Sequence, residues 1–380
     1  MRTLLVPLPG PDPQLFRRSN RERNARVAAR AGAEVVGTET LSSAGSAVGV
    51  LVPADCAINV ELFAALDRVQ ASCGWLESAP GWAVLAGPAG ELARYLAAPA
   101  DAASLPRLSI GAAAILDLST RERRRRAAHI ILQRTGKATD GWVSRHWNRP
   151  VSRAISAVLL SLGLAASHAS ILTLLLGFLT AAIAMLPGYF AMVWTGVLFQ
   201  FASILDGVDG EMARATLTES EGGARLDTIV DQLTYVTCFA GVTIGWIREG
   251  GGLTVLWWTV GVGIALVLSL ARGGRFVARY AENASFVFID RAVRRAARDT
   301  GRATLQMAAG MFTLLRRDVF AVIFLVVGLT GQRALVPALI TFGVIVANAT
   351  FSAHHRELVA AAAAERLAPG SSGRTLPRSA

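Results

Sequence analysis

Four aspartates and an arginine between positions 206 and 231 have the residue types and spacing for phosphate chemistry. Asp206 and Asp209 precede Arg214, and Asp227 and Asp231 follow it. Carboxylate oxygens are hard ligands that suit Mg²⁺ or Mn²⁺, and Mg²⁺ commonly completes its coordination shell with substrate phosphates. An arginine guanidinium is a forked donor for a phosphate oxygen. These residues predict a site for a pyrophosphate-containing substrate, in which a spare carboxylate deprotonates an attacking hydroxyl.

Helical periodicity places the same residues on two faces. Positions i, i+3, i+4, i+7 and i+8 share one face of a helix, and this pattern is followed by Asp206, Asp209, Gly210, Ala213 and Arg214. The pattern i, i+4 and i+8 is followed by Gly223, Asp227 and Asp231. The two predicted helices are consecutive and joined by a short loop, so we expect them to pack antiparallel with their carboxylates facing each other. The two glycines leave room for a bulky group beside the backbone.

Carboxylates in or near a membrane have a second interpretation. They are costly there unless they are compensated, and they mark ion pathways in transporters as well as metal sites in enzymes. A transporter would need a continuous polar path across the bilayer, and the outer halves of the predicted spans offer few polar residues for one. The fixed spacing therefore favours an enzyme, with a carboxylate-lined transporter as the alternative.

The pattern D-x-x-D-G-x-x-A-R, eight residues, G, three residues, D, three residues, D resembles the signature of the CDP-alcohol phosphotransferases. All eight fixed positions match, and the resemblance covers about residues 140–358. It implies two metal ions held by Asp206, Asp209, Asp227 and Asp231, and release of CMP. It also implies that Asp231 is the general base and that CDP binds beside Gly210, Ala213, Arg214 and Gly223. Many members begin the first span with Pro-Asn and then Thr or Ser; Ser167, His168 and Ser170 stand there instead.

The sequence indicates the class of reaction more closely than it indicates the acceptor or the donor alcohol. Arg272, Arg275 and Arg356 are candidates for binding a phosphorylated acceptor such as inositol phosphate. They could equally anchor helix ends at lipid headgroups. The expected partners are a CDP-alcohol donor and a hydroxyl acceptor, inositol or inositol phosphate being one candidate. A CDP-diacylglycerol-dependent phospholipid synthase is the alternative within the family.

The part in front of the transferase resembles a subgroup. Enzymes that join an inositol-phosphate cytidylyltransferase to a di-inositol-phosphate phosphate synthase have a similar soluble domain and a similar lead-in, here 140–145 (DGWVSR) and 148–150 (NRP). The Arg-Asp pair at 317–318, before the fifth span, also resembles that group. Positions 7–13 read PLPGPDP and lack the Gly-rich loop of an active nucleotidyltransferase. We therefore expect a degenerate front domain that takes no part in the transfer chemistry.

Composition predicts a membrane protein. The 380 residues are 53% hydrophobic, with a mean hydropathy of +0.44, which is too apolar for an ordinary soluble chain. Apolar runs approaching ~20 residues can cross a bilayer, and six are predicted: 168–186, 189–213, 226–247, 253–272, 318–330 and 334–353. The basic amphipathic stretch 144–162 is expected to lie along the interface, or to make a seventh span. Most arginines fall in one set of loops and only Arg248 and Arg333 in the other, which predicts a cytoplasmic active site and front domain.

The expected fold is a polytopic α-helical membrane domain of six transmembrane helices, preceded by a small cytoplasmic α/β domain. Its boundaries are 1–118 for the α/β domain, 119–162 for a basic connector and interfacial helix, 163–358 for the transferase and 359–380 for a disordered tail.

In the front part, strands at 2–6, 48–52 and 81–86 alternate with helices at 19–33 and 59–71, which favours a mostly parallel sheet. The net charge of +11 fits an anionic membrane and phosphorylated substrates, so the lipid bilayer is an expected partner and nucleic acid is not. A homodimer is a further candidate.

Overall fold

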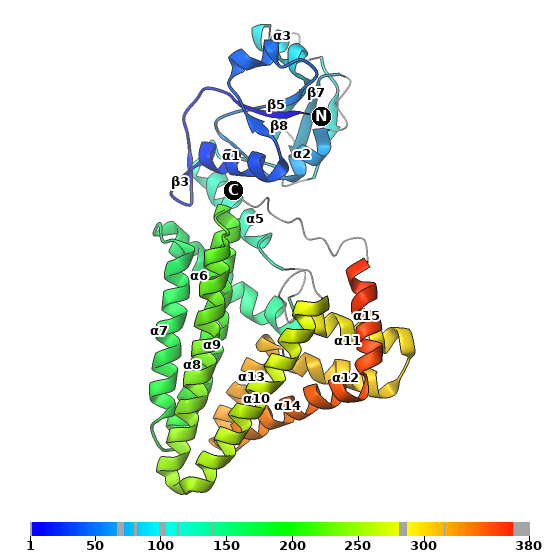
Figure 1. Ribbon diagram of the computed structural model, residues 1–380. Coiled ribbons are helices and arrows are strands. Elements are labelled where there is room, and N and C mark those ends of the chain that lie inside the picture. Colours follow the sequence, from blue (N-terminus) through cyan, green and yellow to red (C-terminus); the bar gives the residue numbers. More distant parts are fainter. Residues whose placement is uncertain are drawn as a thin grey trace. The chain divides into compact units, whose positions relative to one another are not determined.

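The computed structural model describes residues 2–66, 72–79, 82–98, 104–111, 114–137, 140–280, 287–314 and 316–367. The chain forms two compact units. One contains residues 1–136, 153–168 and 208–224, and the other contains residues 137–152, 169–207 and 225–380. The first unit holds the α/β domain, and the second holds most of the helical region (Figure 1).

The α/β domain is built on a six-stranded sheet. Its spatial order is β4 (Glu34–Val35), β1 (Thr3–Pro7), β5 (Val48–Val52), β8 (Trp82–Pro88), β7 (Gly74–Ala79) and β9 (Arg107–Ser109). The pairs β1–β4, β1–β5 and β7–β9 are parallel, whereas β5–β8 and β7–β8 are antiparallel. The sheet is therefore mixed, and the expected mostly parallel sheet is wrong for its centre. The connection between β7 and β8 is far too short for the crossover that a parallel pair requires.

Helices cover both faces of this sheet. On one face α1 (Asn20–Ala31) and α2 (Glu61–Ala65) pack with Leu5 and Val50, and on the other α3 (Ala89–Ala97) packs with Leu4 and Leu51. Because both faces are covered, β5 is apolar at every position, VGVLV, instead of alternating. The strands predicted at 2–6 and 48–52 and the helix at 19–33 are confirmed. Residues 67–71 and 81 of the other predictions lie outside the described residues.

Smaller elements complete the first unit. Two antiparallel pairs are formed by β2 (Gln14–Leu15) with β3 (Arg18–Ser19) and by β6 (Cys56–Ile58) with β10 (Ile115–Asp117). A short 3₁₀ helix, η1, spans Thr38–Ser43, and α5 spans Arg121–Gln133.

The helical region begins with a π-helical turn, η3 (Ser144–Asn148), and α6 (Arg149–Ser161), in the stretch predicted to be interfacial. The later helices are α7 (Ala166–Ala184), α8 (Tyr189–Thr216), α9 (Glu221–Trp246), η4 (Ile247–Gly251), α10 (Gly252–Tyr280), α11 (Val287–Thr300), α12 (Ala303–Leu314), α13 (Arg317–Thr330), α14 (Leu335–Ala353) and α15 (His355–Leu367).

Four helical stretches among the described residues are long and apolar enough to cross a membrane: 166–184, 189–216, 221–280 and 335–353. The third contains two predicted spans, because Gly250 has a φ of +97° and separates α9 from α10. α13 covers the predicted fifth span, but it has only 14 residues, fewer than the ~20 that a bilayer core requires. The count of six spans therefore stays a prediction.

The predicted tail begins too early. α15 continues to Leu367, and its Leu358, Ala361 and Ala362 are buried against α11 and α12. Alanine has the highest helix propensity, and the apolar face of this alanine-rich segment has a partner to pack against. Residues 359–367 are thus helical instead of disordered, and residues 368–380 lie outside the described residues.

Candidate active site

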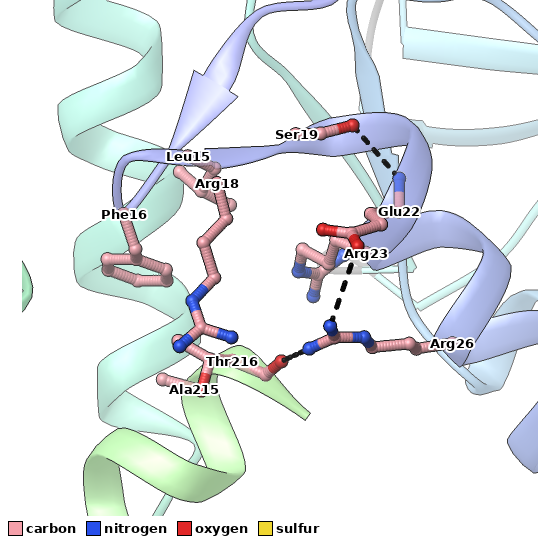
Figure 2. A pocket seen from close by; sticks show the side chains of 9 residues that line it. All are labelled: Leu15, Phe16, Arg18, Ser19, Glu22, Arg23, Arg26, Ala215 and Thr216. Carbon is pink, nitrogen blue, oxygen red and sulfur yellow. Dashed lines mark hydrogen bonds and ion pairs between the residues drawn. The ribbon is translucent and has the colours of Figure 1, made fainter. Parts of the chain in front are cut away.

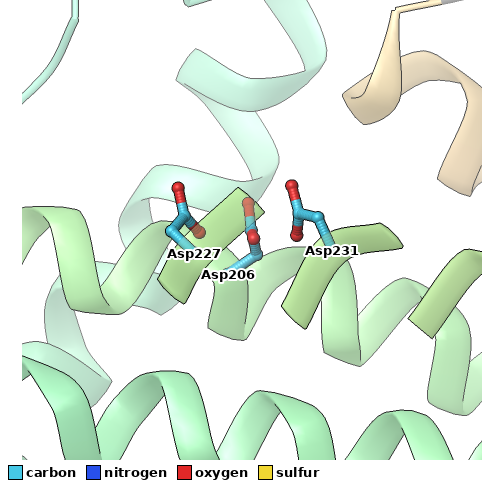
Figure 3. A group of neighbouring side chains, drawn as sticks. All are labelled: Asp206, Asp227 and Asp231. Carbon is cyan, nitrogen blue, oxygen red and sulfur yellow. The ribbon is translucent and has the colours of Figure 1, made fainter. Parts of the chain in front are cut away.

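Three of the four predicted aspartates lie together. α8 carries Asp206, and α9 carries Asp227 and Asp231; one carboxylate oxygen from each lies within 4.8 Å of the other two. Figure 3 shows the three side chains next to one another, with the Asp206 side chain between those from α9. The expectation that the carboxylate faces of these consecutive helices meet is confirmed.

Arg317, the first residue of α13, is part of this cluster. Its Nη1 lies 2.5 Å from Oδ2 of Asp206 and 2.5 Å from Oδ2 of Asp231. Its guanidinium carbon also lies 5.6 Å from the centre of the Tyr235 ring, within the range of a cation–π contact. Sequence reasoning missed this role. The Arg-Asp pair at 317–318 was visible, but no helical periodicity relates it to residues so distant in the chain.

The other oxygens of the cluster are suited to a cation. Asp206 Oδ1 and Asp231 Oδ1 are buried and, within the part of the chain that the structure describes, have no hydrogen-bond partner. A buried carboxylate oxygen without a partner is costly, and a hard divalent cation would compensate it. The donor set, all carboxylate oxygen, therefore fits Mg²⁺ or Mn²⁺.

Asp209 lies one turn further along α8 and is not in the group of three. Its Oδ1 accepts a hydrogen bond from the Gly210 amide at 2.5 Å, and the residue is only 8% exposed. A separation of three residues turns a helix by about 300°, so Asp206 and Asp209 share a face without sharing a direction. The metal-binding role of Asp209 stays a prediction.

The predicted donor-binding residues have local structural roles. Arg214 Nε donates to the Thr135 carbonyl at 2.7 Å. A Cβ on Gly210 would lie 2.9 Å from Arg214 Nη1, so the glycine makes room for the arginine side chain. The Gly223 amide donates to Ser220 Oγ at 3.1 Å in the first turn of α9, and the Ala213 carbonyl accepts from Thr218 N beyond the end of α8. Their contacts with CDP stay predictions.

The lead-in segment at 140–149 is attached to the start of α13. Asp318, 8% exposed, accepts a hydrogen bond from the Ser144 amide at 3.0 Å and pairs with Arg316 at 3.5 Å. A Cβ on Gly141 would collide with this carboxylate, so a larger residue there would require the Asp318 side chain to move. Because Asp318 follows Arg317 directly, these contacts also help to orient the arginine of the cluster.

Asp140 and Arg149 stabilise the same segment. Arg149 Nε donates to Asp140 Oδ2 at 2.8 Å, and the two side chains are 7% and 11% exposed. Burial by itself would raise the pKa of Asp140, but hydrogen bonds from the Arg149 side chain and the Lys137 amide hold it below its ordinary value.

The two arginines of the other loop set have structural partners. Arg333, 2% exposed, pairs with Glu249 at 3.0 Å and donates to the Ala184 carbonyl at 2.6 Å. Arg248 donates to the Met185 carbonyl at 3.0 Å. Carbonyls at the C-terminal end of a helix lack intrahelical partners, so these arginines cap the C-terminus of α7.

The three candidate acceptor-binding arginines differ. Arg272 donates to Ser352 Oγ at 3.1 Å and lies over the Phe351 ring, which ties α10 to α14. Arg275 and Arg356 are exposed. A role of these three in acceptor binding stays a prediction.

Comparison with known proteins agrees with this geometry. The family model for CDP-alcohol phosphatidyltransferase matches residues 166–333. Two archaeal proteins, each named bifunctional IPC transferase and DIPP synthase, are 38% identical: that of Thermococcus kodakarensis over 30% of this chain and 26% of its own length, and that of Archaeoglobus fulgidus over 31% and 23%. The protein of the same name from Aquifex aeolicus is 34% identical over 35% of this chain and 30% of its own length.

The chain thus matches between about a quarter and a third of the length of these curated relatives. The matched family region contains the aspartate cluster, Arg317 and the helices that carry them. Residues 166–333, somewhat less than half of the chain, are similar to the CDP-alcohol phosphatidyltransferase family.

Proposed function

We propose that this protein is a membrane-embedded transferase that moves a substituted phosphate from a CDP-linked alcohol to an acceptor hydroxyl and releases CMP. The observation that carries the proposal is the meeting of Asp206, Asp227 and Asp231 within 4.8 Å, inside the matched family region. The membrane setting is supported by the four long apolar helical stretches.

In this proposal the aspartates divide two tasks. Asp206, Asp209 and Asp227 chiefly hold two divalent cations, Mg²⁺ or Mn²⁺, and Asp231 contributes to metal binding but acts chiefly as the general base. When bound, the cation would neutralise charge on the pyrophosphate and on the leaving CMP. Gly210, Ala213, Arg214 and Gly223 are proposed to receive the CDP portion of the donor.

The bond changes balance without another reactant. The acceptor hydroxyl oxygen forms a bond to the phosphorus that carries the alcohol, the bond from that phosphorus to the bridging oxygen breaks, and CMP leaves with the bonding electrons. The hydroxyl proton passes to Asp231. Asp231 lies one helical turn beyond Asp227 in α9, so a hydroxyl placed against the metal-bound phosphate is within its reach.

The acceptor is proposed to be inositol or inositol phosphate. This rests on the relatives named IPC transferase and DIPP synthase and on the arginines available for a phosphorylated acceptor, Arg272, Arg275 and Arg356. The alternative within the family is a phospholipid synthase that uses CDP-diacylglycerol. The same proposal includes six membrane spans, a cytoplasmic site and front domain, and a homodimer.

The direct test is an assay of purified full-length protein with a panel of CDP-alcohols and acceptors, with CMP as the measured product. CMP release that requires both a CDP-alcohol and an acceptor supports the proposal, and the productive pair names the substrates. A folded, detergent-solubilised protein that releases no CMP from any pair would overturn it.

A further inference from the structure

Backbone strain in the described residues concentrates at one place. Three non-glycine residues have positive φ: Phe16 at +55°, Arg17 at +56° and Leu217 at +56°. Phe16 and Arg17 form the turn between β2 and β3, Leu217 follows the end of α8, and all three belong to the same compact unit. The left-handed region is unfavourable for an L-residue, and such strain persists where surrounding contacts impose it.

Leu217 occupies a position where glycine is usual. The Thr218 amide donates to the Ala213 carbonyl at 2.9 Å, which is the bond of a Schellman motif with Leu217 in its left-handed position. The leucine side chain packs against the core cluster of the front domain, which includes Leu5, Val50 and Leu62. Removing part of this apolar side chain from water is favourable and opposes the backbone cost.

Polar contacts flank this apolar anchor. Arg30 Nη2 in α1 pairs with Glu219 Oε2 at 2.6 Å. Arg26 Nη1, one turn earlier in α1, donates to the Thr216 carbonyl at 3.2 Å (Figure 2). Thr216 is the last residue of α8 and Glu219 lies in the connection to α9, so the two contacts are on either side of Leu217.

Little space remains within this contact. Phe16 from the β2–β3 turn and Arg18 from β3 face Ala215 and Thr216 at the end of α8 across a space of about 10 Å³ (Figure 2). A space of that size holds at most one water molecule. The contact therefore packs two parts of the chain together and offers no room for a substrate.

We propose that the front domain is an intramolecular clamp on the connection between α8 and α9, with Leu217 as its anchor. α8 ends at Thr216 and α9 begins at Glu221, so this connection lies between the helix that carries Asp206 and the helix that carries Asp227 and Asp231. By restraining this connection, the front domain would fix the position of α8 relative to α9. The inference rests on the proposed function only for the statement that these aspartates bind a cation.

The decisive variant is Leu217→Gly in the full-length protein. If Leu217 only ended α8, glycine would relieve the strain and slow amide exchange in residues 214–224. The clamp predicts the reverse, because the anchor is lost: exchange of this segment, measured by mass spectrometry, should accelerate about tenfold. Leu217→Met keeps an apolar side chain and should stay close to the wild type. The matched control is Leu162→Gly, at a leucine that is 58% exposed at the end of α6.

A charge exchange tests the polar contact. Arg30→Glu and Glu219→Arg should each accelerate exchange in residues 214–224 by only about a few-fold, because a solvent-accessible ion pair is a weak contact. The double variant should restore protection. Equal exchange in the single and double variants would overturn the role of this pair in the clamp.

Mn²⁺ affinity, measured by electron paramagnetic resonance, reports whether the clamp acts on the aspartates. Leu217→Gly should weaken it about tenfold, and Leu217→Met should not. Unchanged affinity with faster exchange would overturn the effect on the helix pair. Slower or unchanged exchange would overturn the clamp itself. If the wild type binds no Mn²⁺, the metal part of the proposed function fails, and the exchange data still decide whether the front domain clamps the connection.

Discussion

Arg317 donates through Nη1 to Oδ2 of Asp231 over 2.5 Å, across 86 positions of sequence. The same nitrogen lies equally close to Asp206, so one guanidinium neutralises one carboxylate from each of the two aspartate-bearing helices. The arginine is thus the counter-charge that the protein itself supplies at this site.

Arg317→Met should destabilise the protein in excess chelator and should make its stability depend on Mn²⁺. Removing one partner of a largely buried ion pair leaves uncompensated carboxylates, and we expect the melting temperature to fall by about 5 °C or more. Added Mn²⁺ should restore most of the loss, because a bound ion stabilises the folded state. Arg298→Met, at an exposed arginine of α11, is the control and should show neither effect. A melting temperature of Arg317→Met that does not respond to Mn²⁺ would contradict the interpretation that Arg317 and a bound cation compensate the same carboxylates.

Transfer activity should depend absolutely on Mg²⁺ or Mn²⁺. The cluster offers carboxylate oxygens and no soft ligand, and two of those oxygens are buried without a hydrogen-bond partner in the described part of the chain. CMP release should stop in excess chelator and return when Mg²⁺ is added beyond the chelator concentration. Full CMP release in chelator would rule out metal dependence.

Asp231→Asn and Asp209→Asn should separate base from metal ligand. Asparagine keeps the shape of aspartate and removes its basicity, so Asp231→Asn should lower turnover by about 10²- to 10⁴-fold while donor affinity stays similar. Asp209→Asn should instead weaken metal and donor binding together. Both quantities can be measured on the same preparations. If Asp231→Asn loses donor affinity as severely as Asp209→Asn, Asp231 is not a dedicated base.

The Asp140–Arg149 pair should make stability depend on acidic pH. Since the pKa of folded Asp140 lies below its ordinary value, its contribution is present above the unfolded pKa of about 3.9 and is lost as pH falls through the folded pKa. Asp140→Asn should lower stability by ~3 kcal/mol at pH 7. The difference in melting temperature between wild type and variant should shrink below about pH 4; a constant difference from pH 7 to pH 3 would argue against an ionised Asp140.

The front domain should not carry out cytidylyl transfer. The N-terminus of α1 already has an internal anion, because Asp12 accepts hydrogen bonds from Ser19 Oγ at 2.6 Å and from the Arg21 amide at 3.1 Å. A nucleotide phosphate at that helix end would meet a carboxylate in the place where amides normally bind it. The full-length protein with CTP, Mg²⁺ and inositol phosphate should release no pyrophosphate. Release at an enzymatic rate would show that the domain is active.

The sequence by itself determines features that depend on neighbouring residues and on consecutive elements. Asp206 on one helix and Asp227 and Asp231 on the next follow helical spacing, and a short connection makes consecutive helices neighbours, so their meeting could be predicted from positions alone. The same holds for β5, whose unbroken apolar run required cover on both faces.

Three other features depend on contacts between distant segments, and only the tertiary structure shows them. Arg317 enters the cluster because α13 packs beside the aspartates, and no periodicity relates it to them. Leu217 has positive φ because a core from another part of the chain receives its side chain. α15 extends into the predicted tail because α11 and α12 cover its apolar face. In each case the arrangement is stabilised by a side chain that packs or pairs with residues far away in sequence. A local sequence pattern does not show which distant residues these are.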